Sequence, residues 1–299
     1  MGQVNEKALI EASRTNAKDE VEKLIQFNVP LHGVDAEGNT ALHCASFHGH
    51  TDIIKLLLAA RADTSKRNKQ LDTPLLLAAI NNREPALREL AAVADVNAQD
   101  KQGSTSLHFA AGEGLLKLVK FLVEECDARV DIENIHGVTP MFCAILQSQI
   151  EVVKYFLATF PDIVHQRDAN EDTPLHFACL LDPCEDMVEI LLQAGAEVQA
   201  VNSKGETAAE KALKATRGLF AEKTTAVEML EKCAQRQRDQ QLAKEQEAMD
   251  KLTVAGLLKA ATKRGITQVK RYVEGEFEIN SSDATYTTAL HIASYSGNT

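Results

Sequence analysis

Large apolar residues recur along this chain in stripes that have the spacing of one face of an α-helix. Residues 53–58 form one such stripe, with apolar side chains at i, i+1, i+4 and i+5. The same pattern returns at 118–123, at 152–157 and at 187–192. Each stripe would bury several large side chains, and each of these contributes roughly 1.5–3 kcal/mol. The pattern predicts a series of amphipathic helices that pack against one another.

A short motif stands before the stripes at near-constant spacing. It reads Thr-Ala-Leu-His at residues 40–43, and related copies begin at Thr73, Thr105, Thr139, Thr173 and Thr207. Successive threonines are 32 to 34 residues apart, and a period of this length indicates one supersecondary unit that is stacked many times. Around the first copy, Gly38 suits a turn and Gly49 suits a helix end, because glycine adopts positive φ without steric cost. Each repeat is therefore predicted to be turn, helix, helix and return.

These residues resemble the ankyrin repeat family. The likeness rests on Asp35 to Ser46 with Gly49-His50, on Ala94-Asp-Val-Asn97 and on Gly195-Ala-Glu-Val198, and it covers nearly all of residues 1–234. It implies an all-α fold, a curved α-solenoid of helix-turn-helix repeats with β-hairpin or turn fingers. It also implies that the fingers and first helices line a concave face. In such repeats the motif threonine bonds the motif histidine, which bonds the backbone of the neighbouring repeat.

Some repeats depart from this pattern. Leu76 and Phe142 replace the motif histidine, so we expect two inter-repeat hydrogen bonds, worth about 1 kcal/mol each, to be absent. Leu71 and Glu171 occupy glycine positions in the fingers. Asn82 stands at a helix-ending glycine position, and asparagine is the next-best residue for a left-handed backbone. We expect local adjustments at these sites and an uninterrupted stack.

The motif and its spacing predict three parts. Residues 1–234 form a first array of about seven repeats, with a capping repeat at 1–34 and a degenerate one at 201–234. Residues 235–251 are rich in good helix formers and form a polar linker helix. We interpret it as a solvated spacer or an outer cap for the first array, with partner binding as the alternative. Residues 252–299 begin a second array that is truncated in its second repeat.

The second array is predicted from an internal alignment. Residues 8–51 align without gaps onto 256–299, and a further motif, Thr288-Ala-Leu-His291, falls at the equivalent place. Thr299 then corresponds to Thr51, where a second helix should begin. A first helix without its partner would expose apolar surface. We therefore expect the natural protein to continue beyond this point.

Composition excludes several classes of function. The formal net charge is -11, whereas a surface that binds nucleic acid needs clustered Lys and Arg. No apolar stretch reaches the roughly 18–20 residues that cross a bilayer, so we expect no membrane insertion. The six cysteines form no Cys-x-x-Cys pair and resemble small buried residues of the repeat. This usage favours a reducing compartment, the cytoplasm or the nucleus.

The sequence carries no convincing catalytic, cofactor or metal motif. His43, Cys44, His48 and His50 stand close together, but His43 belongs to the repeat motif and His50 to the Gly-His that follows it. No zinc-finger-like ligand set, phosphate-binding loop or nucleophile elbow is present. We therefore predict a protein that is not an enzyme, with no catalytic residue, no cofactor, no metal and no small-molecule substrate.

The resemblance places variable, surface-forming positions at the finger tips and near the end of each first helix. The candidate partner-binding residues at the helix ends are Phe47, His48, Ile80, Asn81, Glu113, Leu146, Gln147 and Leu180. Those at the tips are Glu37, Gln70, Gln102, His136 and Asn170. The apolar members would form a broken line along the concave face, and apolar groups exposed in a row often mark an interface. The alternative is that they pack beneath the next finger.

Two functions fit these features. The first is a non-catalytic scaffold that binds a partner protein on the concave face of the first array. The alternative is a targeting or regulatory region of a larger enzyme or channel whose active domain lies beyond residue 299. Nucleic-acid binding is disfavoured by the charge.

Overall fold

The computed structural model describes residues 2–181 and 185–216, together with the single positions 230, 235, 242 and 244. The chain divides into two parts, Met1–Leu230 and Glu231–Thr299. Almost all described residues belong to the first part. Apart from positions 235, 242 and 244, the expected linker helix lies outside the described residues, and so does the second array.

The described part of the chain is a succession of short helices. The first helices of the repeats are α1 (Gly2–Arg14), α3 (Ala41–His48), α5 (Pro74–Ile80), α7 (Ser106–Gly112), α9 (Pro140–Leu146), α11 (Pro174–Ala178) and α13 (Ala208–Thr216). The second helices are α2 (Lys18–Gln26), α4 (Thr51–Ala59), α6 (Glu84–Ala91), α8 (Leu116–Glu125), α10 (Ile150–Thr159) and α12 (Glu185–Gln193). A 3-10 helix, η1 (Pro161–His165), follows α10 and was not expected from the sequence.

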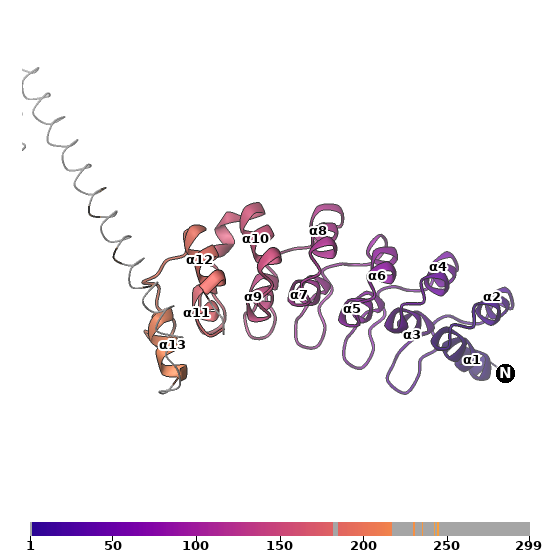
Figure 1. Cartoon of the computed structure of the whole chain (residues 1–299). Helices are drawn as coiled ribbons and strands as arrows, with labels where there is room; N and C mark the ends of the chain where they lie inside the picture. The colour runs from indigo at the N-terminus through magenta and orange to yellow at the C-terminus, as the bar shows by residue number, and fades with distance from the viewer. Residues whose placement is uncertain are drawn as a thin grey trace, which may run out of the picture. The chain divides into compact units, whose positions relative to one another are not determined.

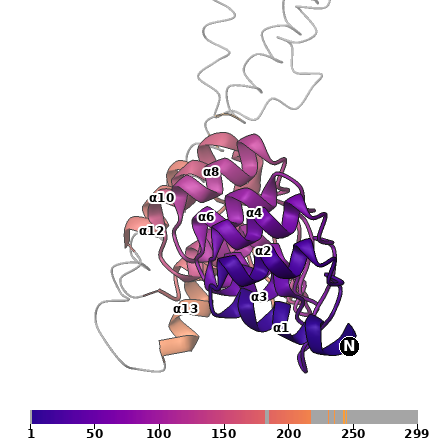
Figure 2. The ribbon, with the colours of Figure 1, turned by 90° about the vertical axis from the view of Figure 1, so that its right-hand side faces the viewer.

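The helices of the first part form two layers. The first helices lie side by side in one layer and the second helices lie in the other (Figure 1). Figure 2 shows the same stack from the end that carries α1 and α2. The fingers extend from the first-helix layer as loops, and the only β-type pairing among the described residues is an isolated bridge between Val201 and Thr207. The expected all-α stack of helix pairs is confirmed, and its fingers are turns.

The apolar stripes form the core between the layers. Ile53, Ile54 and Leu57 of α4 are fully buried, and Val119 and Leu122 repeat this in α8. A single helix pair cannot bury both of its faces, so each stripe is covered by a neighbouring repeat. The stack is therefore stabilised by contacts between successive repeats.

The motif threonines begin the first helices. Thr40 is the N-cap of α3, where its side chain accepts a hydrogen bond from the backbone N–H of His43. The His43 ring is buried, with Nδ1 2.8 Å from the Thr40 hydroxyl and Nε2 3.1 Å from the carbonyl oxygen of Asp72 in the next repeat. His108 and His176 make equivalent contacts with the carbonyls of Val138 and Glu206. These are the inter-repeat bonds that the family resemblance implies.

The partners determine which nitrogen of these rings carries the proton. The backbone N–H of Thr40 only donates, and it lies 3.2 Å from Nδ1 of His43, so Nδ1 accepts. The Asp72 carbonyl only accepts, so Nε2 carries the hydrogen. A proton on Nδ1 would face the backbone N–H of Thr40, which is also a donor, and this hydrogen bond would be lost. His43, and His108 with its equivalent contacts, are therefore neutral in the folded chain.

We expect the free energy of unfolding to fall as pH falls below about 6.5. Burial lowers the pKa of both His43 and His108 from the ordinary 6.5. The unfolded chain consequently binds protons that the folded chain does not, and stability decreases from pH 6.5 down to the lowered pKa values by up to about 1.4 kcal/mol per pH unit per histidine. Urea denaturation at a series of pH values measures this slope. The double variant His43→Gln/His108→Gln should show a flatter dependence; equal slopes would contradict the assignment.

Two repeats lack the motif histidine, and the structure shows what replaces it. Leu76 and Phe142 are fully buried apolar side chains at that position. The Phe142 ring lies 5.0 Å from the Phe177 ring of the next repeat. Thr139, which has no histidine to contact, instead donates its hydroxyl hydrogen to Oε1 of Gln166 at 2.8 Å. Apolar packing and a different polar partner thus substitute for the missing bond.

Each finger is closed by one acidic or amide side chain at the start of its turn. In the first finger, Oδ1 of Asp35 accepts backbone N–H bonds from Glu37 and Asn39, both at 2.9 Å. The same two-bond pattern recurs at Asn68, Asp100, Asn134, Asp168 and Asn202. These side chains hold every finger in the same conformation.

Backbone bonds join neighbouring fingers at their tips. The pairs, N–H donor first, are Lys69 to Glu37, Lys101 to Gln70, Ile135 to Gln102, Ala169 to His136 and Ser203 to Asn170, with distances of 2.9 to 3.2 Å. This tip ladder runs along the whole series of fingers. It fixes the tip backbones relative to one another while their side chains remain free to contact other molecules.

The two fingers that lack glycine have a strained backbone, and each contains an arginine that bonds to it. Leu71 and Glu171 have φ of 64° and 62°, a left-handed backbone that costs a non-glycine residue about 1–2 kcal/mol. Arg67 donates from Nη1 to the carbonyl of Leu71 at 3.5 Å and to the next finger at Gln99 at 2.7 Å. Arg167 does the same with Glu171 and Val201 at 3.2 and 2.8 Å. Arg67 and Arg167 therefore each tie two neighbouring fingers together.

Replacing Leu71 by glycine is expected to stabilise the fold by about 0.5–1 kcal/mol. The left-handed backbone would cost nothing, and this gain exceeds the added entropy of the unfolded chain. Urea denaturation measures the change. As the matched control, Gly103→Ala should destabilise, because φ is 79° and a Cβ there would lie 3.0 Å from Cα of Asn134. A loss of stability in Leu71→Gly would show that the side chain, 44% exposed, matters more than the strain.

Candidate protein-binding surface

Three large apolar side chains lie exposed at the ends of first helices. Phe47, the last residue but one of α3, is 44% exposed. Ile80 and Leu146, the last residues of α5 and α9, are 40% and 42% exposed. Leu180, which follows α11, is less exposed. Together these four residues form the helix-end row. In the repeat between Ile80 and Leu146 the equivalent position is Gly112, so the row is interrupted there.

The residue after each row position differs from repeat to repeat in exposure and in hydrogen bonding. His48, Glu113 and Gln147 are exposed, whereas Asn81 is half-buried and donates its amide to the carbonyl of Leu77 at 2.8 Å. His48 meets the edge of the Phe47 ring, with centroids 5.0 Å apart. Partial burial and the nearby His50 lower the pKa of His48. His48 is therefore an aromatic and neutral neighbour of Phe47 at pH 7.

A second set of side chains fixes the backbone beneath the row. Each reaches back from one repeat to a carbonyl at the end of the previous first helix. The pairs are His50 Nε2 to Arg14 at 3.1 Å, Arg83 Nε to Phe47 at 3.2 Å, and Gln149 Nε2 to Gly112 at 3.2 Å. These bonds satisfy carbonyls that a helix end leaves unpaired. The row is thus presented on a rigid backbone, a feature that sequence reasoning missed because the three residue types differ.

The finger tips provide the other edge of the surface. The expected tip residues Glu37, Gln70, Gln102, His136 and Asn170 are all exposed. Each is also the carbonyl acceptor of one bond of the tip ladder. Ile135, 61% exposed, adds an apolar group to the fourth tip. The structure therefore brings the tip residues into one ordered line, and the helix-end residues into another.

Comparison with known proteins identifies the repeat. Residues 60–134 and 127–202 match the family model of ankyrin repeats in three copies, and residues 9–58 match the model of ankyrin repeats in many copies. The chain belongs to the ankyrin repeat family. This membership explains both the repeated threonine motif and the stacked helix pairs.

Several ankyrin-repeat proteins are similar to the chain over part of its length. It is 28% identical over 182 residues to the nuclear factor NF-kappa-B p105 subunit of Gallus gallus, covering 58% of this chain and 18% of that protein. It is 30% identical over 169 residues to inversin of Homo sapiens, covering 54% and 16%. It is 34% identical over 129 residues to the B-cell lymphoma 3 protein homolog of Mus musculus, covering 42% and 29%. The chain thus spans less than a third of each of these relatives.

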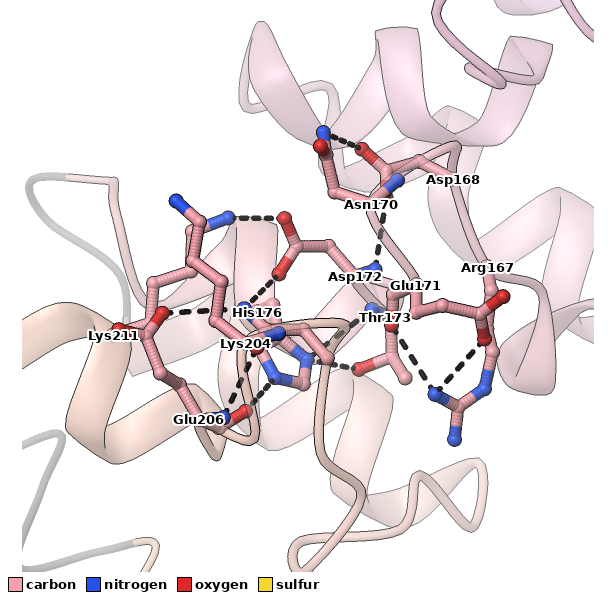
Figure 3. A network of polar contacts seen from close by, with 11 residues as sticks. Arg167, Asp168, Asn170, Glu171, Asp172, Thr173, His176, Lys204, Glu206 and Lys211 are labelled. Carbon is pink, nitrogen blue, oxygen red and sulfur yellow. Dashed lines mark hydrogen bonds and ion pairs between the residues drawn. The ribbon is translucent and has the colours of Figure 1, made fainter.

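The last described ankyrin repeats are joined by a buried ion pair (Figure 3). Lys211 of α13 places Nζ 2.5 Å from Oδ2 of Asp172, whose side chain is 5% exposed. The other oxygen of Asp172 accepts from Nδ2 of Asn202 at 2.9 Å. The Lys211 ammonium also lies 5.2 Å from the centre of the Phe177 ring. Because every polar atom of this carboxylate is satisfied within the chain, the network holds α13 in place and is not available to a ligand.

A metal site, a reactive thiol or a membrane-spanning helix would give the described ankyrin repeats a further function. Within residues 2–181 and 185–216, no three His, Cys, Asp or Glu side chains gather as a metal site would require. Burial raises the pKa of Cys143 to about 11, so this thiol is neutral and a poor nucleophile. No helix in the same residues is long and apolar enough to span a membrane. What the surface does offer is a rigid line of apolar and polar side chains.

Proposed function

We propose that the ankyrin array at residues 1–234 is a non-catalytic scaffold that binds a partner protein on the face formed by its first helices and fingers, the concave face of the family. Ankyrin repeats mediate protein–protein interaction, and family membership supports this general role. The observation that carries the assignment to this face is the exposure of Phe47, Ile80 and Leu146 at equivalent positions of three repeats. Exposed apolar groups in a line are typical of interfaces.

Binding at this face would draw on a surface that is already ordered. The tip ladder and the carbonyl contacts of Arg83 and Gln149 fix the backbone on either side of the helix-end row. A partner therefore meets side chains whose positions are set before contact, and little conformational entropy is lost on the array's side. Large apolar side chains at the centre of such a surface supply most of the binding energy.

A second candidate function is that the array targets or regulates a larger protein. It is favoured by the relatives, which are much longer than the region they share with this chain: the matched region is 18% of the p105 subunit and 16% of inversin. In this case the same face would still recruit the partner. The two functions differ only in what the array is attached to, which the downstream coding sequence would reveal.

The double variant Phe47→Ala/Leu146→Ala is expected to lose partner capture by at least about tenfold while it keeps a normal unfolding transition. Both side chains are more than two fifths exposed, so their removal leaves the core intact. The measurement is affinity capture from cell extract followed by quantitative mass spectrometry.

The matched control is Phe27→Ala/Val93→Ala. It removes two apolar groups that are 79% and 60% exposed and lie at the ends of second helices, away from the helix-end row. This variant should capture the same partner as the unaltered chain. Equal capture by both double variants would show that the helix-end row is not the binding site.

A further inference from the structure

The interruption of the helix-end row at Gly112 is not required by the backbone. Gly112 is the last residue of α7, and its φ does not lie in the left-handed region where glycine is favoured. A Cβ at this position would meet only Cβ of Cys143 at 3.8 Å and Cγ of Gln147 at 3.9 Å, which are ordinary contacts. Glycine within a helix costs about 1 kcal/mol relative to alanine. Glycine thus makes the helix less stable at a position where a residue with a side chain would fit.

The effect of this glycine is an empty place in the middle of the row. Ile80 stands before it and Leu146 after it, and both carry large exposed side chains. The floor of the place is neutral, because Cys143 is a protonated thiol at pH 7. The amide of Gln149 holds the Gly112 carbonyl, so the backbone there is fixed. We call this place, between Ile80 and Leu146, the Gly112 gap.

The finger tips opposite the row carry unpaired positive charge. Lys69 and Lys101 are exposed at the tips of neighbouring fingers, which a tip-ladder bond joins. Among the described residues neither lysine takes part in an ion pair, although the chain as a whole has a net charge of -11. The second and third fingers carry no exposed carboxylate, whereas Glu37 is exposed on the first finger, Glu133 on the fourth and Glu171 on the fifth. Glu113, which follows the gap, is also exposed. The second and third fingers therefore complement a negatively charged partner.

We infer that the occupant of this face is an extended acidic segment of a partner protein, which seats one bulky apolar side chain in the Gly112 gap and sets carboxylates against Lys69 and Lys101. Neighbouring helices pack about 8–10 Å apart, so the row from Phe47 to Leu146 spans roughly 30 Å. An extended chain covers this length in about nine or ten residues. The inference rests on the proposed function and adds the chemistry of the partner.

A peptide-display library of about twelve fully randomised residues, the length that spans the row, tests the inference on the whole 299-residue chain. The selected peptides should carry net negative charge and share one bulky apolar residue. Affinities of one such peptide, labelled with fluorescein, are then measured for variants by fluorescence polarisation. Gly112→Leu fills the gap and should weaken binding at least about tenfold. It should also raise the melting temperature, because a helix glycine is removed, so lost binding cannot reflect unfolding.

Charge is tested by reversal at two sites. Lys69→Glu/Lys101→Glu should weaken binding several-fold, with a smaller effect in high salt, where surface charges are screened. The control Lys23→Glu/Lys117→Glu makes the same change in net charge at exposed positions of α2 and α8 and should bind normally. Selection of basic peptides, of peptides without a shared bulky residue, or of none overturns the inference. If Phe47→Ala/Leu146→Ala abolishes binding but Gly112→Leu and Lys69→Glu/Lys101→Glu do not, the binding face stands and the assigned occupant is wrong.

Discussion

Replacing Phe142 by alanine is expected to lower the free energy of unfolding by about 3–5 kcal/mol. Phe142 stands where other repeats hold the motif histidine, and its side chain has no exposed surface. Its ring packs at 5.0 Å and 60° against that of Phe177 in the next repeat. Alanine would leave a cavity between two repeats, and the surrounding helices can close it only in part. Urea denaturation followed by circular dichroism measures the change.

The matched control for this variant is Phe27→Ala. It deletes the same group from a side chain that is 79% exposed, and surface changes of this kind stay within about 0.5 kcal/mol. A repeat array can unfold in more than one step, so the transition is also followed by a second probe. A cost below about 1 kcal/mol for Phe142→Ala would mean that this ring is not a main contact between the two repeats.

The second large effect is expected at the buried ion pair of the last described repeats. Lys211→Met should destabilise the fold by about 3 kcal/mol, because it leaves the carboxylate of Asp172 buried without its cation. The side chains of Asp172 and Lys211 are only 5% and 22% exposed, so solvent does little to replace the lost contact. Asn202 would remain as the one side-chain donor to that carboxylate. The change is measured by urea denaturation.

Two further variants distinguish the charge from the packing. Asp172→Asn/Lys211→Met removes both charges and should recover most of the loss, since no buried charge is left unpaired. Lys154→Met breaks the exposed pair with Glu151, whose side chains are 52% and 70% exposed, and should cost no more than about 0.5 kcal/mol. A double variant as unstable as Lys211→Met would show that the contact of the Lys211 ammonium with the Phe177 ring carries the effect, and not the unpaired carboxylate.

The helices could be predicted from the sequence because their signals are local. The apolar stripe at 53–58, the threonine that begins a first helix and the glycine or asparagine that follows α3, α5 and α7 all act within one repeat. Asn82 is an example: it replaces the helix-ending glycine, and its φ of 53° is the left-handed value expected for that position. The candidate site positions could be numbered for the same reason, since they lie at a constant offset from the threonine.

The contacts between repeats could not be predicted in the same way. The tie between two fingers is made by an arginine at 67 and at 167 but by a glutamine at 99, so no common residue type marks it. The same holds for the carbonyl contacts of His50, Arg83 and Gln149. Their partners lie about one repeat away, and long polar side chains reach them only once the stack has formed. Whether a helix-end residue such as Ile80 is exposed also depends on the following repeat.

Site-specific photocrosslinking tests the central claim, that a partner protein binds the helix-end row, most directly. A photoreactive phenylalanine analogue is placed at Phe47, Ile80 or Leu146 in turn, and as a control at Phe27, which is the most exposed of the large apolar residues described. The whole chain is irradiated in cell extract, and the joined proteins are identified by mass spectrometry. The same protein should be joined at the three row positions and not at Phe27. Joining from Phe27 alone, with none from the row, would contradict the central claim.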